Sequence, residues 1–303
     1  MTSKKPWPAL TLAAGPVEVS PRVLREQSRP VLYHYDPAFI ELFGQVCHLV
    51  QQAFRTKYDV VLMQGEAILA LEAAAASLFE PGDKVLNLVS GIFGKGYEHF
   101  IRRYGGEPVE LAVPYNDAID SAEVQAVLEA QPDIKYLSVV HSETPSGTVN
   151  PIEAIGRIAR AHGVLTIVDT VSGLGSELLS PEGWNMDIAI AGPQKCLGAP
   201  PGLSLVTVSP AAWEAMERHR PPLRGSFLSL LDWRDTWLAK KTFPYTPSVS
   251  TVYGLEAALL AMLEVGVERY VERHQSIARA CRRGVEALGL KLWAAREAID
   301  ANF

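Results

Sequence analysis

The chain has 303 residues, of which 48% are hydrophobic and 20% are charged, and its formal net charge is -6. This is the composition of a globular protein with a sizeable core. An acidic balance without a basic stripe excludes nucleic-acid and membrane-surface partners, and no apolar stretch is long enough to span a bilayer. We therefore expect a soluble, cytoplasmic protein that acts on small molecules.

Cysteine and histidine spacing gives no metal site. The three cysteines are too scattered for a disulfide framework or a paired metal-ligand motif, and the seven histidines form no zinc-type cluster. We expect plain thiols and no bound metal. Only His34 and His141 fall in segments that carry other special features.

Short β-branched runs alternate with helical patterns from residue 60 onward, which predicts βαβ units and a mostly parallel sheet. The fold class is therefore α/β. Strands are expected at 84–89, 108–113, 136–140, 164–168, 187–191 and 203–208. Helices are expected at 66–79, after a glycine-rich loop at 90–96, after the loop 141–150, and at 252–265 and 267–288.

The organisation expected from these patterns is one large domain followed by part of a second. Residues 1–250, with an N-terminal arm, form the large domain. Residues 251–303 contain a linker helix and the start of a smaller C-terminal α+β domain, with a strand beginning at 290–293. Because Asn302 and Phe303 do not resemble a natural domain end, we expect this small domain to be truncated.

Two residues at strand ends suggest chemistry. Asp169 follows the expected strand 164–168, and Lys195 lies in the loop after 187–191. A lysine amine can form a Schiff base with an aldehyde, and a carboxylate can hold a pyridine nitrogen protonated. Each residue alone is also compatible with a helix cap or an exposed loop lysine. Together, at the carboxyl edge of an α/β sheet, they predict vitamin B6 chemistry.

Five segments resemble the fold-type-I, class V aminotransferases of the alanine-glyoxylate and serine-pyruvate type, in the order and spacing of that family. They are Ala70–Ala74, Ser90–Gly94, His141–Gly147, Val168–Ser172 and Gly192–Lys195. The resemblance covers nearly all of residues 8–303. Within the family, the run Lys195–Leu203 is most similar to members that transfer the amino group of pyridoxamine to pyruvate.

The resemblance implies roles for particular residues. Lys195 is the Schiff-base lysine and proton shuttle, and Asp169 partners the pyridine nitrogen. Phe93 and Val171 are expected to sandwich the ring, where a family relative carries tyrosine in place of Phe93. Thr144 is expected near the phenolic oxygen of the ring or against Asp169, with an ordinary turn threonine as the alternative.

Cofactor contact is expected also of Gln194, which precedes the lysine. Glu66 then distinguishes between members of the family. Phosphate-binding relatives place small or hydroxyl-bearing residues at this helix start, because free N–H groups and the helix dipole bind an anion there. A carboxylate in that place repels a phosphate group but can accept a hydrogen bond from a 5′-hydroxyl group. The alternative is that Glu66 only caps its helix.

The segment 243–247 reaches the cofactor of a neighbouring subunit in the family. Phe243 stands where phosphate-binding members have tyrosine, so a donor hydroxyl is missing, whereas Thr246 is retained as part of the phosphate cup. Near the N-terminus, Tyr33 is expected at the substrate entrance or in aromatic packing against the partner subunit.

The function that these residues predict is the reaction of pyridoxamine and pyruvate to pyridoxal and L-alanine in a homodimer or higher homo-oligomer. The B6 vitamer is then a substrate, and no permanently bound cofactor is expected. Two alternatives are an alanine- or serine-glyoxylate aminotransferase that holds pyridoxal phosphate, and a catalytically incomplete binding protein. The family's carboxylate-binding arginine is not identified, and Arg224 and Arg296 are poor substitutes.

Overall fold

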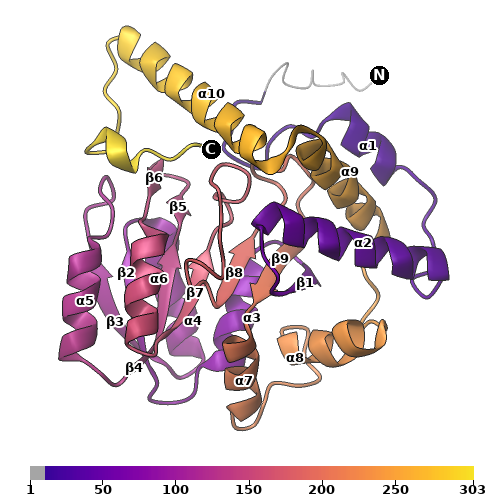
Figure 1. Cartoon of the computed structure of the whole chain (residues 1–303), viewed down its shortest axis with the longest axis horizontal. Coiled ribbons are helices and arrows are strands. Elements are labelled where there is room, and N and C mark those ends of the chain that lie inside the picture. Colours follow the sequence, from indigo (N-terminus) through magenta and orange to yellow (C-terminus); the bar gives the residue numbers. More distant parts are fainter. Residues whose placement is uncertain (1–10) are drawn as a thin grey trace, which may run out of the picture.

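The computed structural model describes residues 11–303, and its centre is a sheet of seven strands in the order β1-β9-β8-β7-β4-β2-β3 (Figure 1). A two-stranded hairpin, β5 (Ser142–Glu143) and β6 (Thr148–Val149), stands beside it. The sheet strands are β1 (Asp59–Gln64), β2 (Lys84–Val89), β3 (Glu107–Ala112), β4 (Ile134–Val140), β7 (Leu165–Asp169), β8 (Ile188–Ala191) and β9 (Leu203–Val208).

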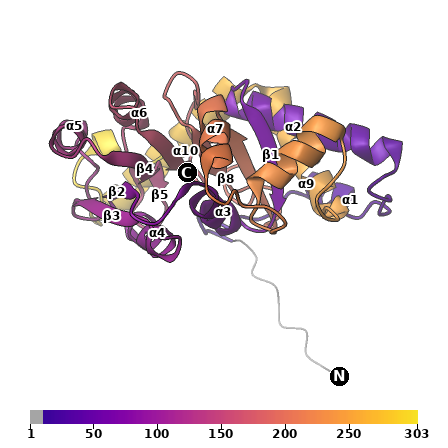
Figure 2. The ribbon, with the colours of Figure 1, turned by 90° about the horizontal axis from the view of Figure 1, so that it is seen from below.

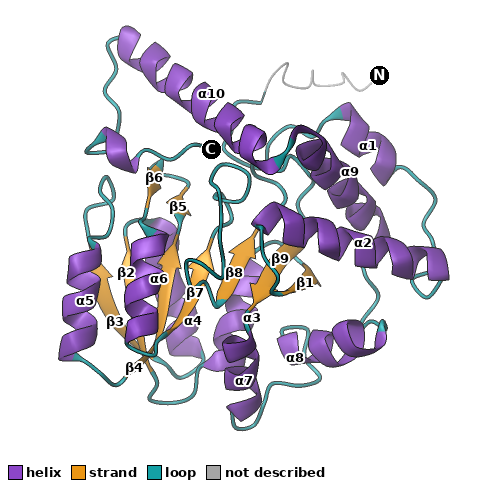
Figure 3. Ribbon diagram, in the orientation of Figure 1, coloured by secondary structure: helices purple, strands orange, loops and turns teal. Residues whose placement is uncertain are grey.

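The sheet is mostly parallel, as the sequence predicts. Only β9 runs antiparallel to its neighbours β1 and β8. Every residue of β8 and β9 is buried, which explains their continuous apolar runs, because helices cover both faces of the sheet. Figure 3 shows the strands enclosed by helices. The expectation of an α/β fold with a mostly parallel sheet flanked by helices is confirmed by this topology.

Helices lie on both sides of this sheet. Figure 2 shows α5 and α6 on one side and α3 and α4 on the other. The helices are α1 (Pro21–Gln27), α2 (Pro37–Phe54), α3 (Ile68–Leu78), α4 (Ile92–Arg103), α5 (Ser121–Ala130), α6 (Ile152–Ala161), α7 (Pro210–Arg218), α8 (Leu230–Trp233, continued by a π-helical turn over Arg234–Leu238), α9 (Val249–Val265) and α10 (Val267–Ala287).

Three expectations about local structure were wrong. The glycine-rich segment 90–96 is mostly helical, because α4 already begins at Ile92. The expected loop 141–150 contains the β5–β6 hairpin, which a glycine at positive φ, Gly147, turns back on itself. Residues 290–293 form no strand. They lack a neighbouring strand with which to pair among the described residues.

The two last helices differ in how they are buried. α9 packs against α1 and α2 and contributes Val252, Tyr253 and Leu259 to the core. In α10 only Val267 and Val271 are buried, and the helix extends away from the sheet (Figure 3). The chain then returns to β6, where the Ala301 N–H donates to the Gly147 carbonyl oxygen at 2.9 Å. The division into domains at residue 250 stays a prediction.

Within residues 11–303, no single helix is both long enough and apolar enough to cross a membrane. The pair α9 and α10 meets the length and composition requirements together, with a bend of 89° between the two helices.

Glycine at position 156 gives a test of the packing of α6. An ideal Cβ at Gly156 would overlap the Trp184 carbonyl oxygen and lie 3.0 Å from its carbon. We expect Gly156→Ala to destabilise the protein by about 1–3 kcal/mol, because the added methyl group overpacks this contact. In α10, Gly284 has no atom within 4 Å of such a Cβ. The control Gly284→Ala should stabilise by roughly 0.5–1 kcal/mol. Urea unfolding of both variants measures this, and changes of equal sign would contradict the packing argument.

Candidate active site

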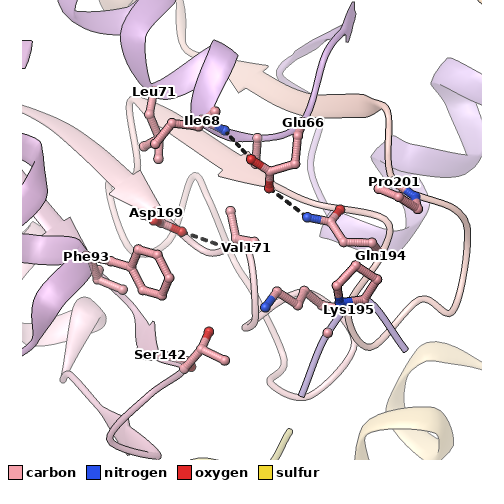
Figure 4. A pocket seen from close by; sticks show the side chains of 15 residues that line it. Glu66, Ile68, Leu71, Phe93, Ser142, Asp169, Val171, Gln194, Lys195 and Pro201 are labelled. Carbon is pink, nitrogen blue, oxygen red and sulfur yellow. Dashed lines mark hydrogen bonds between the residues drawn. The ribbon is translucent and has the colours of Figure 1, made fainter. Parts of the chain in front are cut away.

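Five segments that follow parallel strands meet at the carboxyl edge of the sheet, where α/β proteins place their sites. They form a cavity of about 230 Å³ (Figure 4). Its wall contains Glu66 after β1, Phe93 after β2, Ser142 after β4, Asp169 at the end of β7 and Lys195 after β8. The two catalytic candidates and Glu66 therefore share one cavity.

The Asp169 carboxylate is buried, with 9% of the residue exposed. Its Oδ1 accepts a hydrogen bond of 2.9 Å from the Val171 N–H. Burial raises the pKa of Asp169 to about 7, and the nearby charges of Glu143 and Glu66 act in the same direction. The Val171 bond and Lys195 act against this shift. A cationic group beside Asp169 would restore its ionised form.

Lys195 reaches the cavity past the N-terminal arm. Its amine points into the cavity below Val171, towards the side of Ser142 and Phe93 (Figure 4). Gly15 lies against its side chain, and an ideal Cβ there would overlap Cδ and lie 2.9 Å from Cε and Nζ. The Val17 N–H donates to the Gln194 carbonyl oxygen at 3.0 Å. A glycine in the arm thus leaves room for the lysine.

Glu66 accepts a hydrogen bond at the start of α3 and also lines the cavity, and its role in choosing the ligand stays a prediction. Its Oε2 accepts a hydrogen bond of 3.0 Å from the Ile68 N–H. Its Oε1 accepts one of 2.7 Å from Gln194 Nε2. Figure 4 shows both bonds at the edge of the cavity. Gln194 therefore contacts Glu66 as well as lining the cavity.

Phe93, Val171 and Thr144 also line the cavity. Phe93 and Val171 face the space between Asp169 and Lys195 (Figure 4), the placement that a ring sandwich requires. Phe93 is 44% exposed. The Thr144 hydroxyl makes a hydrogen bond of 2.7 Å with the Ser172 hydroxyl, so no direct bond joins Thr144 to Asp169.

Sequence reasoning missed a buried carboxylate, Glu143, that shapes this wall. Glu143 is fully buried, and its oxygens accept hydrogen bonds from the Gly94 N–H at 2.8 Å and the Phe93 N–H at 3.3 Å. It thus caps α4 from a different segment of the chain. Burial raises the pKa of Glu143, whereas these two bonds lower it. The motif 141–147 points to this residue but does not indicate which helix it caps.

Ser142 was missed as well. The residue is 3% exposed, it lines the cavity, and its hydroxyl has no hydrogen-bond partner among the described residues. A serine after a strand carries no signal by itself that could have identified it. Its backbone is fixed by pairing with Val149 in the hairpin.

Three predicted residues do not line this cavity. Phe243 is buried in the core, where it stacks on Trp237 with ring centroids 5.0 Å apart. Thr246 and Tyr33 are exposed, Tyr33 to 67%. Their expected contacts involve a neighbouring subunit or the entrance, so these roles stay predictions. The buried Phe243 side chain has no polar atom.

The remaining candidates have structural partners. The His141 ring is buried 3.2 Å from the Thr170 hydroxyl, and burial lowers its pKa to about 4. Arg224 pairs with Asp235 at 2.7 Å and Arg296 with Asp117 at 2.8 Å, and neither arginine lines the cavity. Residues 11–303 contain no group of three side chains that could hold a metal ion.

A pyridine aldehyde or amine of the vitamin B6 type fits these groups. Asp169 supplies a buried carboxylate for a protonated ring nitrogen, and Lys195 supplies an amine for the aldehyde carbon. Phe93 and Val171 supply apolar faces for the ring. The raised pKa of Asp169 is the cost of holding that carboxylate ready without a cationic partner.

This chain belongs to the class V aminotransferase family, whose model matches residues 26–299. Over 292 residues it is 49% identical to a pyridoxamine-pyruvate transaminase of Mesorhizobium japonicum, covering 96% of this chain and 74% of the relative. An alanine-glyoxylate aminotransferase of Drosophila melanogaster is 30% identical over 296 residues, covering 96% and 75%.

Solved structures give the same relationship. The crystal structure of pyridoxamine-pyruvate aminotransferase from Mesorhizobium loti matches with a TM-score of 0.94 and 48% identity, covering 97% of this chain and 75% of that chain. The ureidoglycine-glyoxylate aminotransferase of Bacillus subtilis matches with a TM-score of 0.91 and 30% identity, covering 96% and 75%. The fold and the family are therefore shown independently.

Asp169 should make the stability of the ligand-free protein depend on pH. Its pKa in the folded protein, about 7, lies above the ordinary value of 3.8. Between these values the folded protein keeps a proton that the unfolded chain has lost, so this contribution to stability falls as pH rises through that window. Asp169→Asn removes the buried charge. We expect its Tm to exceed the wild-type Tm most above pH 7, by about 2–4 °C per kcal/mol.

The difference between the two melting temperatures should shrink towards pH 4. Differential scanning calorimetry of both proteins after exhaustive dialysis checks this. A difference that stays constant from pH 4 to 8 would contradict the raised pKa. Asp232→Asn is a control at a carboxylate outside the cavity.

Proposed function

We propose that this protein is a transaminase that converts pyridoxamine and pyruvate to pyridoxal and L-alanine, with the unphosphorylated vitamer as substrate and no permanently bound cofactor. The observation that carries the proposal is the Glu66 carboxylate at the start of α3, on the edge of the cavity that holds Asp169 and Lys195. The similarity to a pyridoxamine-pyruvate transaminase, at 49% identity, supports the same reaction.

Glu66 opposes a phosphate group in two ways. Two unit charges 4 Å apart repel by about 4 kcal/mol at an effective dielectric constant of 20. In addition, Glu66 Oε2 already accepts the bond from the Ile68 N–H, a helix-terminal donor of the kind that binds phosphate in other proteins. A 5′-hydroxyl group has neither problem, since it can donate a hydrogen bond to the carboxylate.

The other residues that line the cavity have separate roles in the proposed reaction. The Lys195 amine is the group that attacks the vitamer's aldehyde carbon and moves a proton between the two carbons that exchange the amino group. Asp169 holds the ring nitrogen protonated, so that the ring can take up electron density when bound. Phe93 and Val171 keep the ring plane fixed and exclude water from its faces.

The alternative is a conventional alanine- or serine-glyoxylate aminotransferase. The family generally uses pyridoxal phosphate, and relatives at about 30% identity include ureidoglycine-glyoxylate and alanine-glyoxylate aminotransferases. The cap that Glu66 forms on α3 is compatible with this reading. The two functions differ in which form of the vitamer binds more tightly, which the variants below measure.

We also propose a homo-oligomer in which segment 243–247 of one protomer approaches the cavity of its neighbour. The exposed side chain of Thr246 supports this arrangement, because it is free to contact another subunit.

Loss of the Lys195 amine tests the reaction itself. Lys195→Ala should lower the formation of pyridoxal from pyridoxamine and pyruvate by at least about 10³-fold, since Lys195 is the one lysine among residues 11–303 that lines the cavity. Stopped-flow absorbance of the product measures the rate. Lys240→Ala changes an exposed lysine and should keep the wild-type rate. Borohydride trapping of pyridoxal on a different lysine would refute the assignment.

Glu66→Ser tests the choice of vitamer. We expect it to weaken pyridoxal binding by roughly 1–3 kcal/mol, the size of a lost charge-assisted hydrogen bond, and to tighten the binding of pyridoxal phosphate. Titration followed by absorbance gives both dissociation constants. Glu66→Gln is the matched control, because it keeps the size of the side chain, removes its charge and replaces one of its two acceptor oxygens with an NH2 donor. A wild type that already prefers pyridoxal phosphate would support the conventional aminotransferase.

A further inference from the structure

Gln194 contacts the residue that carries the proposed specificity, and the reaction assigns no task to its side chain. We propose that Gln194 is a positioning residue that holds the Glu66 carboxylate towards the 5′-hydroxyl group of the vitamer, and that it thereby sets the preference for the unphosphorylated form. This inference rests on the proposed function and names a second residue of its specificity site.

The first observation is the bond between the two side chains. Gln194 Nε2 lies 2.7 Å from Glu66 Oε1. An ionised carboxylate only accepts hydrogen bonds, so the amide must turn its nitrogen, not its oxygen, towards Glu66. The other carboxylate oxygen accepts the Ile68 N–H at 3.0 Å. With one donor on each oxygen, the plane of the carboxylate is fixed.

The second observation is that Gln194 is itself held in place. The residue is 4% exposed, and its backbone oxygen accepts the Val17 N–H at 3.0 Å. An ideal Cβ at Gly192 would lie 2.7 Å from Gln194 Oε1 and 3.0 Å from Nε2. The amide thus lies against Gly192, where the Cβ of any other residue would come too close to it.

The third observation concerns the oxygen of the amide. Gln194 Oε1 is buried and has no hydrogen-bond partner among the described residues. Burying an amide oxygen without a hydrogen-bond partner lowers the stability of the folded protein. The stability of the fold therefore does not explain why the Gln194 side chain lies in this position. The bond to Glu66 is the polar contact that this arrangement gains. We infer that the side chain is placed for Glu66.

Gln194 could instead contact the vitamer directly, as the family resemblance implies. The two roles differ in a double-mutant cycle, because a residue that acts through Glu66 has no effect once Glu66 is removed. They differ also with 5-deoxypyridoxal, which lacks the hydroxyl group that Glu66 would bind. A direct contact to the ring, or a general defect of the cavity, would change the affinity for this compound as well.

The experiment titrates the wild type, Gln194→Met, Glu66→Ala and the double variant with pyridoxal and 5-deoxypyridoxal, followed by absorbance. Methionine keeps the length and packing of glutamine without its donor. We expect Gln194→Met to weaken pyridoxal by roughly 3- to 10-fold, the size of one hydrogen bond, and to leave 5-deoxypyridoxal within about 2-fold. In the Glu66→Ala background, Gln194→Met should have no further effect on pyridoxal.

An equal loss for both compounds, or a loss that persists without Glu66, would overturn the proposal. An unchanged affinity of Gln194→Met for pyridoxal would overturn it too. Gly192→Ala keeps the amide but displaces it, so it should weaken pyridoxal selectively in the same way, even if Gln194→Met proves unstable. A wild type that prefers pyridoxal phosphate would count against the proposed function, whereas the coupling between Gln194 and Glu66 is read from the two unphosphorylated compounds alone.

Discussion

The buried carboxylate of Asp169 sets the demands that the rest of the cavity meets. Asp169 is raised to a pKa of about 7 by burial and by the nearby charges of Glu143 and Glu66. Two of these three carboxylates accept hydrogen bonds from N–H groups at helix starts. Glu143 accepts them at the start of α4, and Glu66 accepts one at the start of α3. The helix termini thus serve the protein's own carboxylates. The charges of Asp169 and Glu66 in the cavity wall therefore favour a ligand that is positively charged where it meets Asp169 and uncharged where it meets Glu66.

The sequence was sufficient to predict the position of site residues that lie at the end of a predicted strand or in the loop after it. Asp169 and Lys195 come directly after buried apolar runs, so their place at the carboxyl edge of the sheet could be predicted. The strands β2, β3, β4, β7, β8 and β9 were predicted within one or two residues of their ends, whereas β1 (Asp59–Gln64) was not predicted. Glu66 was recognised as a charged residue at a helix start, but its second partner, Gln194, lies in a different loop.

The features that could not be predicted depend on contacts between distant segments. Local composition makes 90–96 look like a loop, whereas Glu143 from the β5–β6 hairpin caps α4 there and allows the helix to begin at Ile92. The contact between Gly15 and Lys195 could not be predicted either, because nothing in the sequence near Gly15 distinguishes it from an ordinary turn glycine. The segment 290–293 shows the opposite error, because a strand-like pattern forms no strand without a neighbour to pair with.

The contact between Gly15 and Lys195 has a consequence for the order of folding. The arm can settle against the lysine only after β8 and the following loop have taken their places in the sheet, because those residues form the surface on which it lies. Closing so long a loop early would cost chain entropy with no contacts yet in return. We therefore expect the environment of the lysine to be completed late, so that a spectroscopic signal from that amine would report a late stage of folding rather than the formation of the sheet.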